Sequence, residues 1–250
     1  MTPLVSILIP VFNREKVVKR AIDSALAQTY TNIEVIVCDN ASTDSTWDIL
    51  QSYAKNDKRI KAHRNTCNLG PVQNWLCCLK YASGEYVKFI WSDDAIHPNF
   101  ITETIHPMIN NPTIGFAFSD VQLQIGSGCI HNVYKIGVDG IYNSYMYIKE
   151  AFIQQSRMPV SPGCALFRTQ DVKRFLISQI PNKQGLDFSK FGAGNDLLIF
   201  LQVAYKYPYF YFSSLYNKSS HFAILSDIFF QKKHLHLLTL YSFAFIIKLL

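Results

Sequence analysis

The sequence predicts an α/β fold in which a mainly parallel sheet is flanked by helices. Over the first hundred residues, short apolar runs alternate with segments that carry apolar residues on one helical face. Their spacing is that of right-handed βαβ units, which build parallel sheets. The chain has 250 residues, 49% of them hydrophobic, which is enough for one large domain with a sizeable core.

The first elements follow from this alternation in chain order. Apolar runs rich in β-branched residues predict strands buried on both faces, over residues 4–11, 33–38, 59–63 and 86–91. Helical periodicity predicts the intervening helices, over residues 17–26, 47–53 and 72–82. Asn13 is placed to cap the first of these helices.

The second half is less regular. Apolar runs predict strands, over residues 114–119, 121–125 and 209–212, with a glycine-rich turn at 126–128. Helices are expected over residues 145–155 and 197–205, the latter with Asp196 in its first turn, and finally over 228–250. This last segment is apolar and only weakly amphipathic, so we interpret it as a helical extension to the domain.

Composition limits the compartment and the partners. Six cysteines are scattered without a C-x-x-C pair, which indicates reduced core residues and a reducing, cytoplasmic location. Residues 1–10 lack a basic region and a cleavage site, so they predict a first strand and not a signal peptide. The net charge of +6 is modest and spread along the chain, which disfavours nucleic-acid binding.

Polar residues follow three of the predicted strands at their carboxyl ends. These loops are, in order, residues 10–13 (PVFN), 39–44 (DNASTD) and 92–94 (SDD). In an open parallel sheet ligands bind beyond the carboxyl ends of the strands. Carboxylates such as Asp93 and Asp94 suit Mg²⁺ or Mn²⁺, which in turn bridges phosphate oxygens. The alternative is that Asp93 or Asp94 caps a helix that starts near Pro98.

Several enzyme classes lack their signatures in this sequence. There is no G-x-x-x-x-G-K-[ST], and no G-x-G-x-x-G follows the first strand, which disfavours P-loop hydrolases and Rossmann hydride-transfer enzymes. A G-x-S-x-G nucleophile elbow is also missing. A bound diphosphate would therefore need a metal ion and side chains instead of a glycine cradle.

As an ordered set, the motifs resemble those of family 2 glycosyltransferases, which have the nucleotide-sugar-binding GT-A fold. The matching segments are residues 5–13 (VSILIPVFN), 37–44 (VCDNASTD), 68–71 (NLGP) with Asn74, 82–87 (ASGEYV), 92–94 (SDD), 194–196 (GND) and His221. The resemblance covers about residues 4–226. It departs from the family pattern at Cys38 and Asn40, at Trp91 in place of the first acid of D-x-D, and at Asn195 in place of the common Glu.

The resemblance implies roles for single residues. It implies Asp196 as the catalytic base, and Asp94 and His221 as ligands of Mn²⁺ or Mg²⁺. The expected donor-binding residues are Pro10, Phe12, Asn13, Asp39, Asn68 and Asp93. Simpler interpretations stay open, because Asp39 can cap a turn, Asp196 can cap a helix and His221 can be structural.

The implied reaction is inverting sugar transfer from a nucleotide-diphosphate donor to a saccharide or lipid-linked acceptor in bacterial surface-polysaccharide synthesis. Residues 1–120 would bind the nucleotide sugar and residues 121–226 the acceptor, with Arg168 a candidate for the acceptor side. The tail, residues 227–250, would contact the inner face of the membrane or form a dimer. A catalytically degenerate sugar-binding or nucleotide-binding scaffold and a nucleotidyltransferase remain as alternatives.

Overall fold

A computed structural model describes residues 2–125, 129–153, 157–181, 185, 187–190, 192, 194–215 and 225–226. Its helices are α1 (Val18–Leu26), α2 (Thr46–Asn56), α3 (Pro71–Tyr81), α4 (Phe100–Asn110), α5 (Ser144–Ile153), α6 (Thr169–Phe175) and α7 (Asn195–Lys206), with short 3₁₀ turns at Pro162–Cys164 and Phe188–Lys190. Its strands are β1 (Val5–Val11), β2 (Ile33–Asp39), β3 (Ile60–Arg64), β4 (Tyr86–Phe89), β5 (Ile114–Ser119), β6 (Val121–Ile125), β7 (Cys129–Val133), β8 (Gly140–Asn143), β9 (Ala165–Arg168), β10 (Tyr209–Ser213) and β11 (Leu225–Ser226).

Eight of these strands form one sheet in the order β3-β2-β1-β4-β9-β5-β10-β8. Strands β3, β2, β1 and β4 are mutually parallel, and β5 and β10 run in the same direction. Only β9 and β8 run against them. The predicted α/β fold with a mainly parallel sheet is therefore confirmed, and the short strand β9 is an element that the sequence pattern did not predict.

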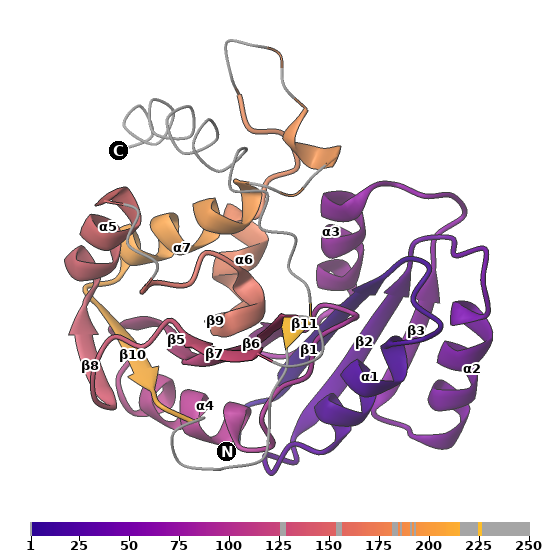
Figure 1. Ribbon diagram of the computed structural model, residues 1–250, viewed down its shortest axis with the longest axis horizontal. Coiled ribbons are helices and arrows are strands. Elements are labelled where there is room, and N and C mark those ends of the chain that lie inside the picture. Colours follow the sequence, from indigo (N-terminus) through magenta and orange to yellow (C-terminus); the bar gives the residue numbers. More distant parts are fainter. Residues whose placement is uncertain are drawn as a thin grey trace.

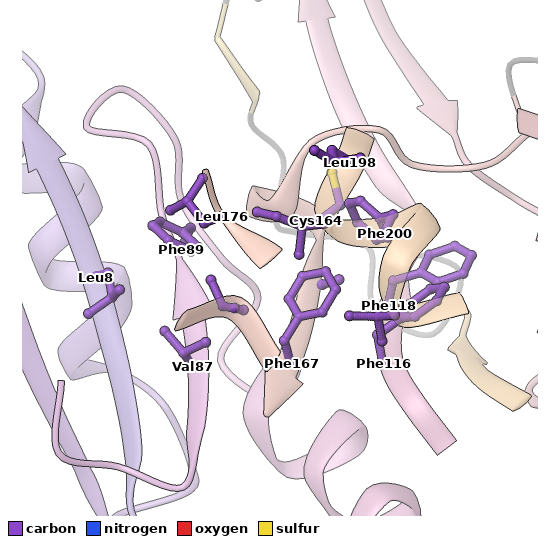
Figure 2. Packing of buried hydrophobic residues seen from close by; sticks show 14 of the residues in the cluster. Leu8, Val87, Phe89, Phe116, Phe118, Cys164, Phe167, Leu176, Leu198 and Phe200 are labelled. Atoms are coloured by element: carbon purple, nitrogen blue, oxygen red, sulfur yellow. The ribbon is translucent and has the colours of Figure 1, made fainter. Parts of the chain in front are cut away.

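Helices cover both faces of this sheet (Figure 1). One face packs against α1, α2 and α4, and the other packs against α3, α5, α6 and α7. All seven residues of β1 and all seven of β2 are buried, as expected for strands covered on both sides. The core between the sheet and helices α3, α5, α6 and α7 is rich in aromatic rings from β5, β9 and α7 (Figure 2).

The described residues contain no helix long and apolar enough to cross a membrane. The predicted turn at 126–128 and the predicted helix over 228–250 lie outside the described residues. A smaller sheet, in the order β11-β6-β7, lies beside the main one (Figure 1).

Candidate functional site

The site lies where the chain reverses its direction of travel across the sheet. From β1 the chain moves to β2 on one side, whereas β4 pairs with β1 on the other side. Such a switch point leaves a crevice at the carboxyl ends of the strands. A cavity of about 240 Å³ opens there, lined by Pro10, Val11, Phe12, Arg14, Asn40, Asn68, Pro71, Asn74, Trp75 and Ser92. Three of the predicted donor-binding residues, Pro10, Phe12 and Asn68, thus line one cavity.

A network of asparagine side chains fixes the walls of this cavity. Asn74 is buried and donates to the carbonyl oxygens of Cys38 (2.9 Å) and Val11 (3.4 Å) at the ends of β2 and β1. Asn65 donates to the side-chain oxygens of Asn74 and Asn40, at 3.0 Å each. Buried polar groups with all partners in place specify one arrangement, so this network holds the loops in a fixed geometry.

Asn40 extends the network to the loop before α3. Its Nδ2 donates to Oδ1 of Asn68 at 2.8 Å, and its Oδ1 accepts from the backbone N–H of Leu69 at 2.9 Å. Asn40 departs from the family motif, and the motif does not predict this role for it. The spacing of asparagines along 65–74 carried a signal, because amides both donate and accept and can link neighbouring loops.

Asn13 connects the first two loops of the site. Its backbone N–H donates to Oγ of Ser42 at 2.9 Å, and its Oδ1 accepts from the backbone N–H of Thr43 at 2.9 Å. Its φ of 51° lies in the left-handed region, which asparagine tolerates better than most residues. Asn13 does not cap α1, whose N-cap is Val17, so the predicted helix cap is wrong and its donor-binding role stays a prediction.

Asp39 is fully buried at the end of β2 and does not line the cavity. Its carboxylate accepts from the backbone N–H of Ser42 at 3.2 Å and from the Ser42 hydroxyl. It also pairs with Nε of Arg64 at 3.1 Å. These contacts make Asp39 the anchor of the turn after β2, and its direct contact with a nucleobase stays a prediction.

Asp93 and Asp94 lie in the turn after β4. The backbone N–H of Asp94 donates to the carbonyl of Trp91 at 2.9 Å, which closes the turn, and Arg20 donates to the carbonyl of Asp93. The next helix, α4, begins at Phe100 with Asn99 as its N-cap. Neither aspartate therefore caps that helix, which removes the simpler interpretation of this pair.

The oxygen chemistry of this turn fits a divalent ion. Mg²⁺ is commonly held by one or two carboxylates together with substrate phosphates, so Asp93 and Asp94 suffice as protein ligands. No group of three or more His, Cys, Asp and Glu residues that could hold an ion occurs in the described part of the chain. His221, the other predicted ligand, lies outside the described residues.

A buried ammonium group lies close to Asp94. Lys88 is fully buried in β4 and donates to the carbonyl of Gly163, with its Nζ 3.9 Å from the ring centroid of Phe100. Burial lowers the pKa of Lys88 to about 8, while electrostatic interactions with Cys164 and Asp94 oppose that shift. The sequence pattern placed Lys88 in a strand but did not identify this charge next to the acidic turn.

Asp196 is the second residue of α7 and is half-buried. Its Oδ1 accepts from the backbone N–H groups of Gly194 (3.0 Å) and Leu197 (2.7 Å). Burial raises the pKa of Asp196 to about 6, while those backbone hydrogen bonds act to lower it. A carboxylate with a pKa near the working pH has the property that a general base requires.

Arg168 is not on the acceptor side, contrary to the prediction. Its guanidinium donates to the carbonyl oxygens of Ile114 (2.5 Å), Pro112 (3.2 Å) and Met108 (3.4 Å), at the start of β5. Arg168 pairs with Tyr86, the first residue of β4, because β9 runs antiparallel to β4. Arg168 therefore lies at the opposite end of the sheet from the cavity.

Comparisons with known proteins agree with this geometry. The family model described as "Glycosyl transferase family 2" matches residues 6–176. Two Escherichia coli relatives are the UDP-Glc:alpha-D-GlcNAc-diphosphoundecaprenol beta-1,3-glucosyltransferases WfaP and WfgD. WfaP is 38% identical over 48% of this chain and 47% of its own length, and WfgD is 36% identical over 48% of this chain and 46% of its own length. The matched segments thus span about half the length of these relatives.

A solved structure supports the fold. The structure of S. aureus TarS 1-349 in complex with UDP-GlcNAc superposes with a TM-score of 0.65 and 21% sequence identity. The match covers 89% of this chain and 58% of that one, and at this level of identity it establishes the GT-A-type fold alone. The family model, by contrast, covers well over half of the sequence and includes the first three motif loops. The chain therefore belongs to glycosyltransferase family 2.

Proposed function

We propose that this protein transfers a sugar, with inversion, from a nucleotide-diphosphate sugar to a saccharide or lipid-linked acceptor in cell-surface polysaccharide synthesis. The cavity at the switch point carries this proposal. It has apolar walls for a nucleoside and amide groups from the asparagine network. The two aspartates of the acidic turn, Asp93 and Asp94, directly follow Ser92, which lines the cavity.

The donor would bind with its nucleoside in the cavity. Phe12, which is 38% exposed at the rim, offers a ring for stacking, and Asn68 offers amide hydrogen-bond donors. Asp39 and Asn13 would keep the surrounding loops in place. We also propose that their side chains contact the donor directly. Asp93 would lie beside the diphosphate.

Asp94 and Asp93 would hold a divalent ion against the diphosphate. A bound Mg²⁺ or Mn²⁺ acts as a Lewis acid that offsets the negative charge of the departing nucleotide diphosphate. Lys88 is buried near Asp94, and the electrostatic interaction between the two favours the protonated form of the Lys88 amine.

Asp196 would act as the base. Its carboxylate would take the proton of an acceptor hydroxyl as the hydroxyl oxygen forms a bond to the anomeric carbon. The bond from that carbon to the diphosphate oxygen breaks on the opposite face, so the configuration inverts in one step. With a pKa of about 6, Asp196 is mostly ionised at neutral pH, and the rate of transfer should rise with pH through about 6.

The printed names of the two Escherichia coli relatives support the acceptor proposal, since both act on a diphosphoundecaprenol-linked GlcNAc. A lipid-linked acceptor would place the protein at the inner face of the membrane, with residues 227–250 as the contact. Flotation with anionic liposomes tests this role. The full chain should float and a chain ending near Ser226 should not, whereas equal flotation of the two removes the membrane role of the tail.

A calorimetric binding panel tests the donor site. The protein is titrated with nucleotide diphosphates and nucleotide sugars, with and without Mn²⁺, and binding that strengthens with the ion is expected. An Asp94→Asn variant should lose the effect of the ion. Absence of metal-dependent binding for every nucleotide would contradict the donor and metal proposals together.

An Asp196→Asn variant tests the base. We expect donor binding to stay unchanged and turnover to fall by about 10²-fold or more, with the loss of the pH dependence near 6. Unchanged turnover would remove the assignment. Slow hydrolysis of a labelled nucleotide sugar by the unmodified protein would exclude the scaffold alternative, which the departures at Trp91 and Asn195 leave open.

A further inference from the structure

Two tryptophans meet between the donor cavity and the loop that leads to Asp196. Trp75 projects from α3, and Trp91 follows β4 in the turn that closes at Asp94. Their ring centroids are 4.9 Å apart at an interplanar angle of 40°. Both side chains are half-buried, in contrast to the fully buried rings of the aromatic core. We call these two residues the tryptophan pair.

Two glycines from the second half of the chain, Gly163 and Gly192, pack closely against the tryptophan pair. A Cβ on Gly192, whose φ of +69° lies in the left-handed region, would collide with the ring of Trp75. A Cβ on Gly163 would lie 2.8 Å from Nε1 of Trp91. Two backbone segments thus approach the rings as closely as glycine allows, which holds the indoles rigidly in place.

Trp75 carries the surface of the pair that faces the cavity. Trp75 lines the 240 Å³ cavity together with Ser92, the residue after Trp91. Nε1 of Trp91 donates to Oγ of Ser161 at 2.8 Å, so the polar atom of that indole is already used. The ring of Trp75 therefore offers apolar surface to the cavity. Trp91, at the position where the family motif commonly carries an acid, packs against that ring.

This surface lies between the cavity and Gly192 in the loop before Asp196, which is where the proposed reaction would place the sugar. Asp93 and Asp94 follow Trp91 by two and three residues. Gly192, which contacts the ring of Trp75, precedes Asp196 by four residues. In the proposed reaction the sugar lies between the diphosphate and the base. A pyranose ring has an apolar face of C–H groups, and aromatic rings bury such faces favourably.

We propose that Trp75, held in place by Trp91, binds the sugar ring of the donor and acts as a specificity-determining surface for it. The proposal rests on the proposed function. It gives a role to the indole that stands at position 91, where the family motif commonly carries an acid, because Trp91 packs against Trp75. Loss of the Trp75 ring should then weaken binding of the nucleotide sugar much more than binding of the nucleotide diphosphate.

The test compares a nucleotide diphosphate with its nucleotide sugar, using UDP with UDP-Glc and UDP-GlcNAc, or the nucleotide that binds best in the panel. In Trp75→Ala, affinity for the nucleotide sugar should fall about tenfold while affinity for the nucleotide stays within twofold. Trp75→Phe, which keeps a ring, should recover most of the loss. Tyr81→Ala is the control, because Tyr81 is 39% exposed at the far end of α3 and does not line the cavity.

Fluorescence gives a readout that does not depend on Trp75→Ala folding. The chain has three tryptophans, so a Trp47→Phe variant reports from the tryptophan pair alone. The nucleotide sugar should change its emission beyond the change caused by the nucleotide. Equal emission changes with the nucleotide and the nucleotide sugar, or an equal loss of affinity for both in Trp75→Ala, would overturn this inference and leave the proposed function intact. Failure of the unmodified protein to bind any nucleotide would overturn the proposed function and the inference together.

Discussion

The two ends of the main sheet are stabilised by different kinds of contact. The parallel part, β3-β2-β1-β4, is tied together by buried polar groups, including the asparagine network and the carboxylate of Glu34. The mixed part, β9-β5-β10-β8, packs with α5 and α7 through aromatic rings: Phe116, Phe118, Tyr147, Phe167, Phe200, Phe210 and Phe212. Figure 2 shows Phe116, Phe118, Phe167 and Phe200 of this set.

This difference separates two tasks. Hydrogen bonds are directional, so the parallel part can hold the loops around the cavity in one defined geometry. Aromatic packing buries large areas without such direction, and it anchors the helix that carries Asp196. Changes in the mixed part should therefore cost the most stability, whereas changes in the parallel part should cost less and act more on the site.

Phe200→Ala gives the largest expected effect. Phe200 is fully buried in α7, with its ring centroid 4.9 Å from that of Phe167, 5.2 Å from that of Phe116 and 5.4 Å from that of Tyr147. Removing it leaves a cavity among these rings, so the free energy of unfolding should fall by about 3–5 kcal/mol. Chemical denaturation measures this change.

The control is on the same helix. Tyr205 is 59% exposed, so Tyr205→Ala should change the free energy of unfolding by no more than about 0.5 kcal/mol. A loss for Phe200→Ala as small as that of Tyr205→Ala would show that the mixed part is not stabilised by its aromatic core.

Glu34 gives the next effect, and it depends on pH. Burial raises the pKa of its carboxyl, but hydrogen bonds from Lys61 (2.6 Å), Ser6 (2.6 Å) and Ser83 (2.8 Å) outweigh burial and lower the pKa to about 2. Because this value is below the 4.5 of an ordinary Glu, the contribution is complete above pH 4.5. It is lost as the pH falls from 4.5 to 2.

The shift corresponds to about 3 kcal/mol, at about 1.36 kcal/mol per pKa unit. Glu34→Gln should therefore lower the free energy of unfolding by up to about 3 kcal/mol at pH 7, and the difference from the unmodified protein should shrink towards pH 2. Glu85→Gln, at an exposed position beside β4, is the control. A difference that stays constant with pH would contradict the role of the charge.

The parallel part is also the part that the sequence predicts well. A strand buried on both faces needs a continuous apolar run, and β1 and β2 have one, so their positions follow from local pattern. Strand β9 has only four residues, Ala165–Arg168, and pairs antiparallel with β4 and β5, which lie far away in the sequence. No local pattern encodes a strand inserted between distant neighbours, so β9 and the helix after it were not predicted.

The site divides in the same way. Pro10, Phe12 and Asn68 are motif residues, and each lines the cavity, while their donor-binding role stays a prediction. The burial of Asp39 was not predicted, because its partner Arg64 comes from a separate strand. The contact of Trp75 with Gly192 likewise depends on tertiary packing between segments over a hundred residues apart. The sequence motifs predict which residue types lie at the loop ends, but they do not predict which of these residues contact one another.

Asn74→Ala tests the asparagine network. The variant removes the side-chain donor of the Cys38 carbonyl oxygen, whereas the Val11 carbonyl oxygen keeps the backbone N–H of Asn40 at 2.8 Å. Leaving buried polar groups unsatisfied costs about 1–3 kcal/mol, so the free energy of unfolding should fall by that amount. Gln73→Ala, exposed one residue earlier on the same helix, should be nearly neutral. A Phe200→Ala loss smaller than the Asn74→Ala loss would reverse the ranking of the two parts.

Ala41→Gly gives the smallest expected effect and has the opposite sign. Ala41 has a φ of 61° in the loop after β2, a left-handed conformation that costs a residue with a Cβ about 1 kcal/mol and glycine almost nothing. The variant should therefore gain up to about 1 kcal/mol in the free energy of unfolding, less the extra entropy of glycine in the unfolded chain. In Ala54→Gly, inside α2, the same change should instead lose about 0.5–1 kcal/mol. A gain in the free energy of unfolding for Ala41→Gly and a loss for Ala54→Gly would show that the loop bordering the cavity is strained at Ala41. A loss for both variants would show that hydrogen bonding in the loop has removed that strain.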